Sequence, residues 1–319
     1  MQKRKLGQSG PEVPPICLGS NVFGWTLSEP DTFHQLDRAV DAGLNFIDTA
    51  DVYSRWVPGH TGGESETILG KWFAKSGRRK DVILATKVGM DMGQDKKGLS
   101  PAYIAQAVDA SLKRLQTDYI DLYQAHRDDE STPLEDSLAA FDKLVKAGKV
   151  RFIGASNYAG ARLAAALETS RKNGLAAYTS LQPHYNLVER HPFESDQLPV
   201  VEKYQLGVIP YFSLAAGFLT GKYRRGDDAS KAARGGMVKK YLDDWGFGVV
   251  DALTEIAAAH RATPARVALA WLLAQPGITA PIASATNDKH LDDLIAAASL
   301  QLDSASIKRL NDVSAPVAA

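Results

Sequence analysis

Four ionisable side chains stand at or just beyond the ends of short apolar segments: Asp48, Tyr53, Lys87 and His126. Taken singly, each has an ordinary structural explanation, such as capping a loop, packing or facing solvent. If the segments are neighbouring strands of one parallel barrel, however, their carboxyl ends open onto the same mouth. The sequence therefore predicts that the four side chains share one pocket.

The chemistry that suits this set is proton transfer by a tyrosine. A free phenol has a pKa of about 10, so exchange of its proton near neutral pH is favoured if that pKa falls by roughly 2–3 units. An ammonium about 4 Å away can supply such a change at an effective dielectric constant of about 20, so Lys87 is expected to lower the pKa of Tyr53. Asp48 would keep the lysine charged, and His126 could orient a carbonyl oxygen or relay its proton. The set fits acid catalysis at a carbonyl whose carbon receives hydride from another molecule.

Eight apolar or β-branched segments that could position these side chains recur along the chain: 16–19, 45–48, 82–87, 119–124, 150–156, 178–182, 207–214 and 279–284. Several lack strict alternation, as expected for parallel strands that are buried on both faces. Stretches with helical spacing lie between them, at 31–42, 101–115, 134–147 and 161–172. This alternation predicts a parallel sheet, and eight strands predict a (β/α)8 TIM barrel that fills residues 1–319 as a single domain.

A doubly wound open sheet is the alternative, and it would place a G-x-G-x-x-G turn after an early strand. The nearest candidate, at 59–63, lacks that spacing. The interval between the last two predicted strands is about twice the others, and it begins with a polar insertion at 221–244 that follows the seventh strand. This insertion could cover a ligand at the mouth of the barrel or be a tolerated surface feature, and composition leaves both open.

Composition excludes several classes of protein. Among 319 residues, 37 Lys and Arg balance 37 Asp and Glu, so the net charge is 0 and no nucleic-acid partner is expected. The single cysteine, Cys17, can form neither an internal disulfide nor a thiolate metal cluster, and no metal is expected. The apolar stretch 208–219 is too short to span a bilayer, and the first residues lack the apolar run of a secretion signal. We therefore expect a cytoplasmic protein that acts on a small molecule; its oligomeric state is left open.

Motifs along the whole chain resemble those of the aldo-keto reductase family. They are R-x-L-G-x-S-G at 4–10, L-G-S-N-x-F-G at 18–24, F-I-D-T-A-x-x-Y at 46–53, G-x-S-E-x-x-L-G at 63–70, S-L-x-R-L-x-x-D-Y-I-D-L-Y-x-x-H at 111–126, G-K-V-R-x-I-G-x-S-N at 148–157, Q-x-x-Y-N-L at 182–187, L-A-x-G-x-L-T-G-K-Y at 214–223 and A-L-A-W-L-L-A-Q-P-G-I-T at 268–279. The resemblance implies a (β/α)8 barrel that transfers hydride between NADP(H) and an aldehyde, ketone or alcohol. It also implies that Tyr53 is the general acid, Lys87 depresses its pKa, Asp48 pairs with Lys87 and His126 orients the substrate.

The same resemblance implies a dinucleotide groove. Ser156, Asn157 and Gln182 would hydrogen-bond the nicotinamide carboxamide, and Tyr211 would stack on the ring. The other implied contacts, from the nicotinamide side through the pyrophosphate to the adenosine end, are Ser20, Asn21, Asp48, Phe212, Ser213, Leu214, Ala215, Gly217, Lys222, Arg234, Ala283, Ala285, Lys289, Asp292 and Asp293.

The chain departs from the family pattern at three places. It has Tyr-Phe-Ser-Leu at 211–214 where the family commonly has Tyr-Ser-Pro-Leu. At the adenosine end Lys289 replaces an arginine or glutamine and favours NADP(H), whereas the two aspartates at 292–293 oppose an extra phosphate, so NAD(H) is the less favoured alternative. The loop at 54–62 is longer than the family minimum, and Trp25 and Trp56 are expected beside the substrate pocket.

Two other functions remain to be weighed against a carbonyl reductase or alcohol dehydrogenase. The β subunits of potassium channels share the family's barrel and tetrad, so a nucleotide-sensing binding protein is the alternative. A hydrolase barrel is less favoured, because two acid–base carboxylates at matched strand ends are not evident in the sequence.

Overall fold

The computed structural model describes residues 1–94, 96–226 and 235–315. Within them, eight parallel strands form one sheet: β3 (Cys17–Gly19), β4 (Phe46–Asp48), β5 (Ile83–Val88), β6 (Ile120–Ala125), β7 (Val150–Ser156), β8 (Tyr178–Gln182), β9 (Gly207–Val208) and β10 (Ile282–Ala283). The strand order is β10-β3-β4-β5-β6-β7-β8-β9, so the last strand pairs with the first. Each strand otherwise lies beside its neighbour in sequence.

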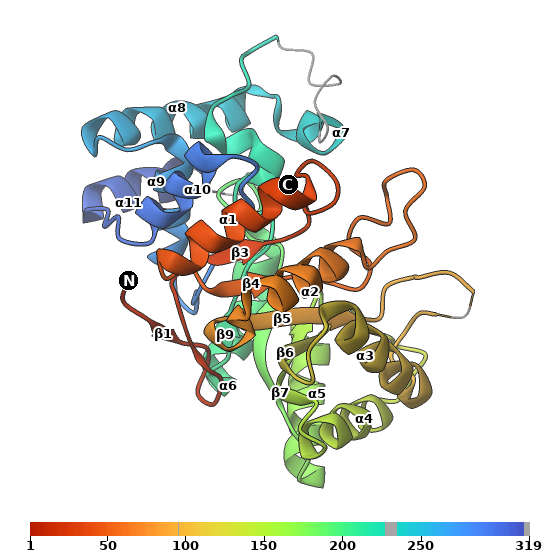
Figure 1. The fold of residues 1–319 in the computed structure, drawn as a ribbon. Coiled ribbons are helices and arrows are strands. Elements are labelled where there is room, and N and C mark those ends of the chain that lie inside the picture. The colour runs from red at the N-terminus through yellow and green to blue at the C-terminus, as the bar shows by residue number, and fades with distance from the viewer. Residues whose placement is uncertain (95, 227–234, 316–319) are drawn as a thin grey trace.

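The sheet closes into a barrel through the backbone that leads into β10. The amide of Thr279 bonds the carbonyl of Val208 at 2.8 Å, and the amide of Ile282 bonds the carbonyl of Pro210 at 2.9 Å. On its other side β10 pairs with β3. A closed sheet has no exposed edge, and helices surround it on the outside (Figure 1). The expected (β/α)8 barrel is confirmed.

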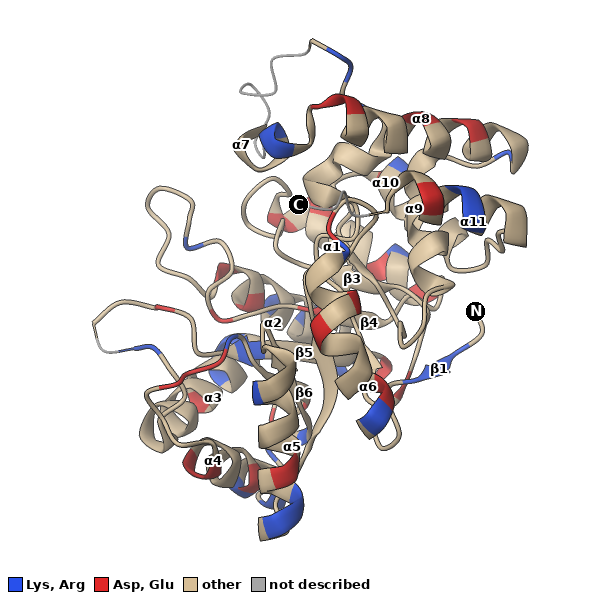
Figure 2. Ribbon diagram, turned by 180° about the vertical axis from the view of Figure 1, so that it is seen from behind, with Lys and Arg blue, Asp and Glu red and all other residues tan. Residues whose placement is uncertain are grey.

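The helices alternate with the strands along most of the chain. They are α1 (Glu29–Asp41), α2 (Glu64–Ser76), α3 (Pro101–Leu115), α4 (Leu134–Lys146), α5 (Gly160–Asn173), α6 (Leu198–Tyr204), α7 (Gly235–Val238), α8 (Asp244–Ala259), α9 (Pro264–Leu273), α10 (Asp288–Ala297) and α11 (Ser304–Val313). Capping sets several of the bounds: in α3 the Ser100 side chain accepts from the Tyr103 amide, and Pro101 starts the helix. Figure 2 shows acidic and basic segments scattered over the helices, with no side of one sign.

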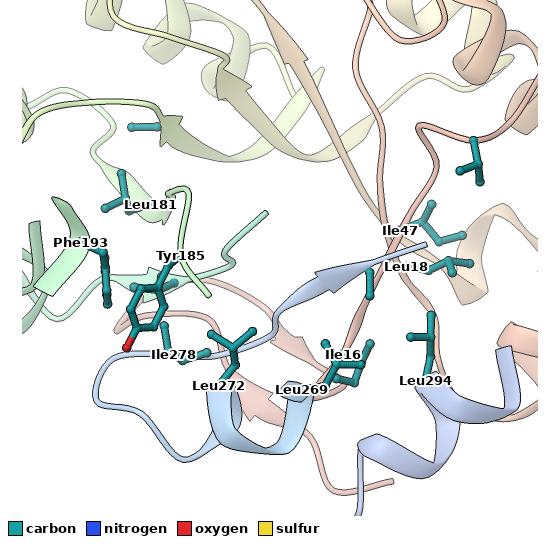
Figure 3. Packing of buried hydrophobic residues seen from close by; sticks show 14 of the residues in the cluster. Ile16, Leu18, Ile47, Leu181, Tyr185, Phe193, Leu269, Leu272, Ile278 and Leu294 are labelled. Carbon is teal, nitrogen blue, oxygen red and sulfur yellow. The ribbon is translucent and has the colours of Figure 1, made fainter. Parts of the chain in front are cut away.

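Buried hydrophobic residues fill the space between the strands and the surrounding helices. In Figure 3 Ile16 lies beside Leu269 of α9, and Leu18 lies close to Leu294 of α10. A second, smaller cluster fills the interior of the barrel and includes Phe46, Ala85 and Leu122. Side chains rather than a channel therefore occupy the centre of the sheet, as expected for a barrel of this size.

An N-terminal hairpin, β1 (Arg4–Lys5) paired with β2 (Glu12–Val13), was not among the expected elements. Leu6 and Val13 of this hairpin are fully buried and pack into the interior cluster. The hairpin therefore belongs to the core that supports the strands, although its strands are only two residues long and leave little pattern in the sequence.

Two predicted strands prove shorter than expected, and both corrections have a local cause. The seventh, predicted at 207–214, ends at Val208, because Pro210 offers no amide hydrogen to a ladder and Phe212 has a positive φ of 52°. The eighth, predicted at 279–284, is assigned only at Ile282–Ala283, because the preceding Pro281 offers no amide hydrogen to a ladder. Within the described residues, no helix is long and apolar enough to cross a lipid bilayer.

Candidate active site

Lys87 is the centre of the candidate site. It belongs to β5, its side chain is fully buried, and its ammonium donates to Asp48 Oδ2 at 2.6 Å, to the Thr49 carbonyl at 2.8 Å and to the Tyr53 hydroxyl at 2.9 Å. An ammonium has three hydrogens, so these contacts account for its full donor capacity. Asp48 is the last residue of β4, the strand beside β5. Neighbouring strands thus bring the cation, the carboxylate and the phenol together, as the sequence predicts.

The Tyr53 hydroxyl accepts from Lys87 and donates to Asp48 Oδ2 at 3.2 Å. Burial, followed by the negative charge and hydrogen bond of Asp48, raises the pKa of Tyr53 well above its ordinary value. The net shift is upward, opposite to the lowering expected from Lys87, and its first cause is burial of the phenol. The carboxylate of Asp48, whose Oδ2 is 2.6 Å from the Lys87 ammonium, adds to the rise.

Two glutamines bind the second oxygen of Asp48. Gln182, at the end of β8, donates to Asp48 Oδ1 at 2.9 Å, and Gln124 of β6 donates to the same atom at 3.3 Å. Asp48 is only 1% exposed, so these bonds replace the water that a carboxylate would otherwise bind. The side-chain amide nitrogen of Gln182 is thereby committed to Asp48.

His126 follows β6, and its ring centre lies 6.1 Å from that of Tyr53 at an angle of 74°. Burial, and then the positive charges of Lys87 and Arg127, lower the pKa of His126 well below its ordinary value. Its ring is therefore neutral near pH 7. The Nδ1 atom is buried and has no hydrogen-bond partner among the described residues. A neutral imidazole in this position can donate a hydrogen bond to a substrate oxygen that lies beside the phenol.

Of the two tryptophans expected at the substrate pocket, Trp56 lies beside the phenol and Trp25 packs on Trp56. The ring centre of Trp56 is 6.0 Å from that of Tyr53, and that of Trp25 is 5.7 Å from that of Trp56. Trp56 is 49% exposed, which is unusual for so large an apolar side chain. The structure thus brings both tryptophans to the neighbourhood of Tyr53.

All four expected nicotinamide contacts form one hydrogen-bonded group with the site. The Tyr211 hydroxyl donates to Asn157 Oδ1 at 2.8 Å, and Asn157 Nδ2 donates to the His126 carbonyl at 2.9 Å. The Ser156 hydroxyl donates to the Gln182 carbonyl at 2.9 Å. These hydrogen bonds connect the segments at the carboxyl ends of four strands, β6 to β9, at the mouth of the barrel.

The loop after β9 holds an unusual backbone conformation. The backbone φ angles of Phe212, Ala215 and Ala216 are positive, at 52°, 47° and 56°. Residues other than glycine rarely adopt such values. Local contacts hold the loop in place: Asn186 donates to the Phe212 carbonyl at 2.9 Å, and the Ser213 hydroxyl donates to the Pro210 carbonyl at 3.1 Å. Backbone strain of this kind is common where a loop binds a ligand.

This loop also borders a cavity of about 520 Å³. Its walls are His184, Phe212, Ala215 and Ala216 on one side and residues between 236 and 241 on the other. Of the remaining expected contacts in the loop, Leu214 packs against the core, and at Gly217 a Cβ would lie 3.0 Å from Lys222 Nζ. The described end of the polar insertion thus lines a cavity, which favours the first of the two possibilities left open by composition, and Arg234 lies outside the described residues.

Ser20 and Asn21 are less available than expected. Ser20 is fully buried and its hydroxyl is 2.8 Å from that of Ser65, while Asn21 Oδ1 accepts from the Ser284 hydroxyl at 2.8 Å. Both side chains therefore join β3 to neighbouring elements in this structure.

At the expected adenosine end, both aspartates of α10 are already paired. Asp292 accepts from Arg38 at 2.7 Å, and Asp293 accepts from Arg266 at 2.7 Å. Because each carboxylate has an arginine partner, the expected repulsion of an extra phosphate beside Lys289 is reduced. Ala283 and Ala285 are buried, so they can offer a ligand little more than their backbone.

Three residues of the site were not singled out from the sequence. Gln124 lies two residues before His126, and His184 lies two residues after Gln182. The ring of His184 stacks on that of Tyr211, with ring centres 5.2 Å apart. Asp51 is 2% exposed, and neither carboxylate oxygen has a partner among the described residues. Burial, followed by the charge of Glu66, raises the pKa of Asp51 to about 8. The sequence signal that could have pointed to Asp51 was its position between Asp48 and Tyr53 along the chain.

The closed β/α barrel, with a tyrosine, lysine, aspartate and histidine at its mouth, defines a class of barrel oxidoreductases, and comparison with known proteins identifies the family. Residues 15–315 match the family model described as "Aldo/keto reductase family". The chain therefore belongs to the aldo/keto reductase family.

Several proteins are similar to this chain over nearly its whole length. It is 37% identical to "Uncharacterized oxidoreductase YrpG" of Bacillus subtilis (strain 168), covering 98% of this chain and 96% of that protein. It is 33% identical to "Aldo-keto reductase yakc [NADP(+)]" of Schizosaccharomyces pombe, covering 97% and 90%. It is also 33% identical to "Probable voltage-gated potassium channel subunit beta" of Oryza sativa subsp. japonica, covering 91% and 89%. The resemblance found in the sequence is confirmed, and the chain is assigned to a family of oxidoreductases that act on small molecules.

Proposed function

We propose that this protein is an NADP(H)-dependent oxidoreductase that reduces aldehydes or ketones to alcohols, or catalyses the reverse oxidation, with Tyr53 as general acid and base. The observation that carries the proposal is the contact of one buried ammonium, that of Lys87, with both the phenol and a carboxylate. The proposal treats residues 1–319 as one barrel domain that works in the cytoplasm.

In reduction, a nicotinamide held by these residues would supply hydride to the carbonyl carbon. Tyr53 transfers its hydroxyl proton to the carbonyl oxygen as the carbon–oxygen double bond becomes a single bond. In the resting structure this hydroxyl points its hydrogen at Asp48, so the hydrogen turns toward the substrate before transfer. The phenolate left behind lies 2.9 Å from the Lys87 ammonium, which stabilises the new charge.

Asp48 and His126 have separate parts in this proposal. Asp48 keeps Lys87 charged in a buried position, and its bonds to two glutamines hold the carboxylate in place. His126 is neutral and stands beside the phenol, so it can bind the carbonyl oxygen without competing as the source of the proton. The carbonyl oxygen of the substrate would then contact one proton donor, Tyr53, and one orienting group, His126.

The groups available for a dinucleotide support the cofactor assignment. Tyr211 presents an aromatic ring whose position is fixed by its hydroxyl bond to Asn157 and by the stack with His184. The backbone of the loop 212–217 and Lys222 would hold the pyrophosphate. Lys289 would favour a 2′-phosphate, and so NADP(H) over NAD(H).

A nucleotide-sensing binding protein is the second candidate, because relatives described as potassium channel β subunits are similar over most of this chain. The two functions differ in the fate of the bound cofactor. A binding protein would retain the dinucleotide, whereas a reductase would release it oxidised at a rate set by the carbonyl compound.

Two measurements test the proposal. Titration of the protein with NADPH and NADH, monitored by nucleotide fluorescence, should show saturable binding that is tighter for NADPH. A screen of aldehydes, ketones, sugars and steroids with NADPH should then reveal turnover with at least one class. Binding without turnover of any carbonyl compound would favour the second candidate, and no binding of either nucleotide would contradict both.

A further inference from the structure

Arg127 introduces a positive charge at the mouth of the barrel. It directly follows His126 and its side chain is exposed. Its charge lowers the pKa of His126 on one wall of the site and opposes the rise in the pKa of Tyr211 on another. The carbonyl of His126, which is bonded to the Arg127 nitrogen, accepts from Asn157 Nδ2 at 2.9 Å, and Asn157 Oδ1 accepts from the Tyr211 hydroxyl at 2.8 Å. Arg127 therefore starts from the peptide that links the proposed substrate-orienting group to the proposed aromatic platform.

The nearest carboxylates in the chain are bound elsewhere. Asp128 accepts from Arg162 at 2.8 Å, and Asp129 accepts from the Leu99 amide at 2.7 Å and from the hydroxyl groups of Ser131 and Thr132. Both acidic side chains are therefore engaged with partners other than Arg127.

Glu189, whose charge raises the pKa of Tyr211, also has hydrogen-bond partners. Glu189 bonds Lys240 and accepts from the Tyr241 hydroxyl at 2.9 Å. Across residues 1–94, 96–226 and 235–315, the side chain of Arg127 forms neither an ion pair nor a hydrogen bond. At the centre of the site, by contrast, Asp48 balances Lys87. Arg127 therefore adds a positive charge at the mouth that none of these carboxylates pairs with.

We propose that Arg127 is a specificity-determining residue that favours substrates with an anionic group, a carboxylate or a phosphate, near the reacting carbonyl. This inference rests on the proposed function. A guanidinium has a planar set of donors that fits two oxygens of either anion, and it stays charged at all relevant pH values. Because the side chain is exposed, water and salt weaken the contact, and we expect a preference of about tenfold rather than complete exclusion of neutral substrates.

Matched pairs of substrates isolate this effect. The carboxylate pair is 4-carboxybenzaldehyde and methyl 4-formylbenzoate, which share one aldehyde and differ in charge. The phosphate pair is glyceraldehyde 3-phosphate and glyceraldehyde. For the wild type, we expect a higher kcat/KM for the charged member of at least one pair, and the pair that responds identifies the anion. Added NaCl should reduce that advantage.

Variants then assign the preference to this residue. Arg127→Met should raise KM for the preferred charged substrate by about tenfold, with little change in kcat or in KM for its neutral partner. Arg127→Lys should restore part of the preference, because it restores the charge without the planar donors. Arg309→Met removes an exposed positive charge from α11 and serves as the control, so it should leave the preference unchanged.

Binding gives a readout that does not depend on turnover. We expect 4-carboxybenzyl alcohol to quench the fluorescence of the tryptophans near Tyr53 at lower concentration in the wild type than in Arg127→Met. Equal kinetics for the charged and neutral members of both pairs, or equal losses for both members in Arg127→Met, would overturn the inference and leave the proposed function standing. Absence of turnover of every carbonyl compound would instead remove the proposed function and this inference with it.

Discussion

The Lys87 ammonium lies 2.9 Å from the Tyr53 hydroxyl and 4.7 Å from the centre of the Tyr53 ring. Burial and Asp48 together keep the resting phenol protonated, because they raise its pKa. The contact with Lys87 therefore matters most when the proton leaves and the oxygen becomes negative. An interaction that is stronger in the transition state than in the resting state lowers the barrier.

Loss of the ammonium should affect both activity and stability. In Lys87→Met, we expect carbonyl reduction to fall by several orders of magnitude, because the phenolate loses its stabilising charge. Asp48 would remain buried without its partner, which should cost about 3–5 kcal/mol in the free energy of unfolding. Steady-state kinetics and denaturant unfolding measure the two effects separately.

A double variant separates charge balance from catalysis. Asp48→Asn combined with Lys87→Met removes both charges, so it should recover much of the lost stability while activity stays low. If the double variant regained activity, or if Lys87→Met alone kept wild-type turnover, the proposed role of the lysine would be wrong.

The acid side of the pH profile should report the state of His126. Its pKa is depressed by burial and by nearby cations, so the ring stays neutral as the pH falls through 6.5. We expect kcat/KM for reduction to show no loss near pH 6.5 that is due to this residue, with the decline appearing only at clearly lower pH. A His126→Gln variant, which cannot titrate there, provides the comparison. A wild-type decline centred near 6.5 that disappears in this variant would contradict the assignment.

Stability should depend on pH through Asp51. Its pKa of about 8 in the folded chain lies above the value of about 3.9 in an unfolded chain. The neutral form is thus favoured by folding, so its stabilising effect is complete below pH ~4. That effect is lost as the pH rises to about 8, at roughly 1.4 kcal/mol per pH unit.

The variant Asp51→Asn cannot ionise and should escape this loss. We expect its melting temperature relative to the wild type to improve progressively between pH 5 and pH 8. Asp312→Asn, at an exposed ion pair on α11, is the control and should show no such trend. A constant difference between Asp51→Asn and the wild type over this range would show that the carboxyl group does not titrate as described.

Much of the barrel could be predicted from the sequence, because buried parallel strands leave compact apolar segments. Six of the eight strands begin and end within a residue of the predicted bounds, including β7 at Val150–Ser156. The two exceptions are strands interrupted by a proline, Pro210 in the seventh and Pro281 in the eighth, although the apolar pattern continues. Apolar character indicates burial, whereas strand length also depends on backbone hydrogen bonds that composition does not reveal.

The site shows a similar division. Strand ends were sufficient to predict that Asp48, Tyr53 and Lys87 would meet, because parallel register fixes where those ends lie. The sign of the change in the pKa of Tyr53 could not be predicted, since it depends first on how deeply the phenol is buried and then on how close the Asp48 carboxylate lies to it. Nor did the sequence show that Asp51 would be buried without partners among the described residues, because that depends on the packing around it.

The most direct test of this account is a single-turnover experiment on Tyr53→Phe loaded with NADPH and mixed with a carbonyl substrate of the wild type. The change removes one hydroxyl and leaves the aromatic ring, so the affinity for NADPH should stay close to that of the wild type. We expect oxidation of NADPH by the carbonyl compound to slow by about 10²–10⁴-fold, the range that a positioned proton donor contributes. Undiminished oxidation by this variant would contradict the claim that Tyr53 supplies the proton.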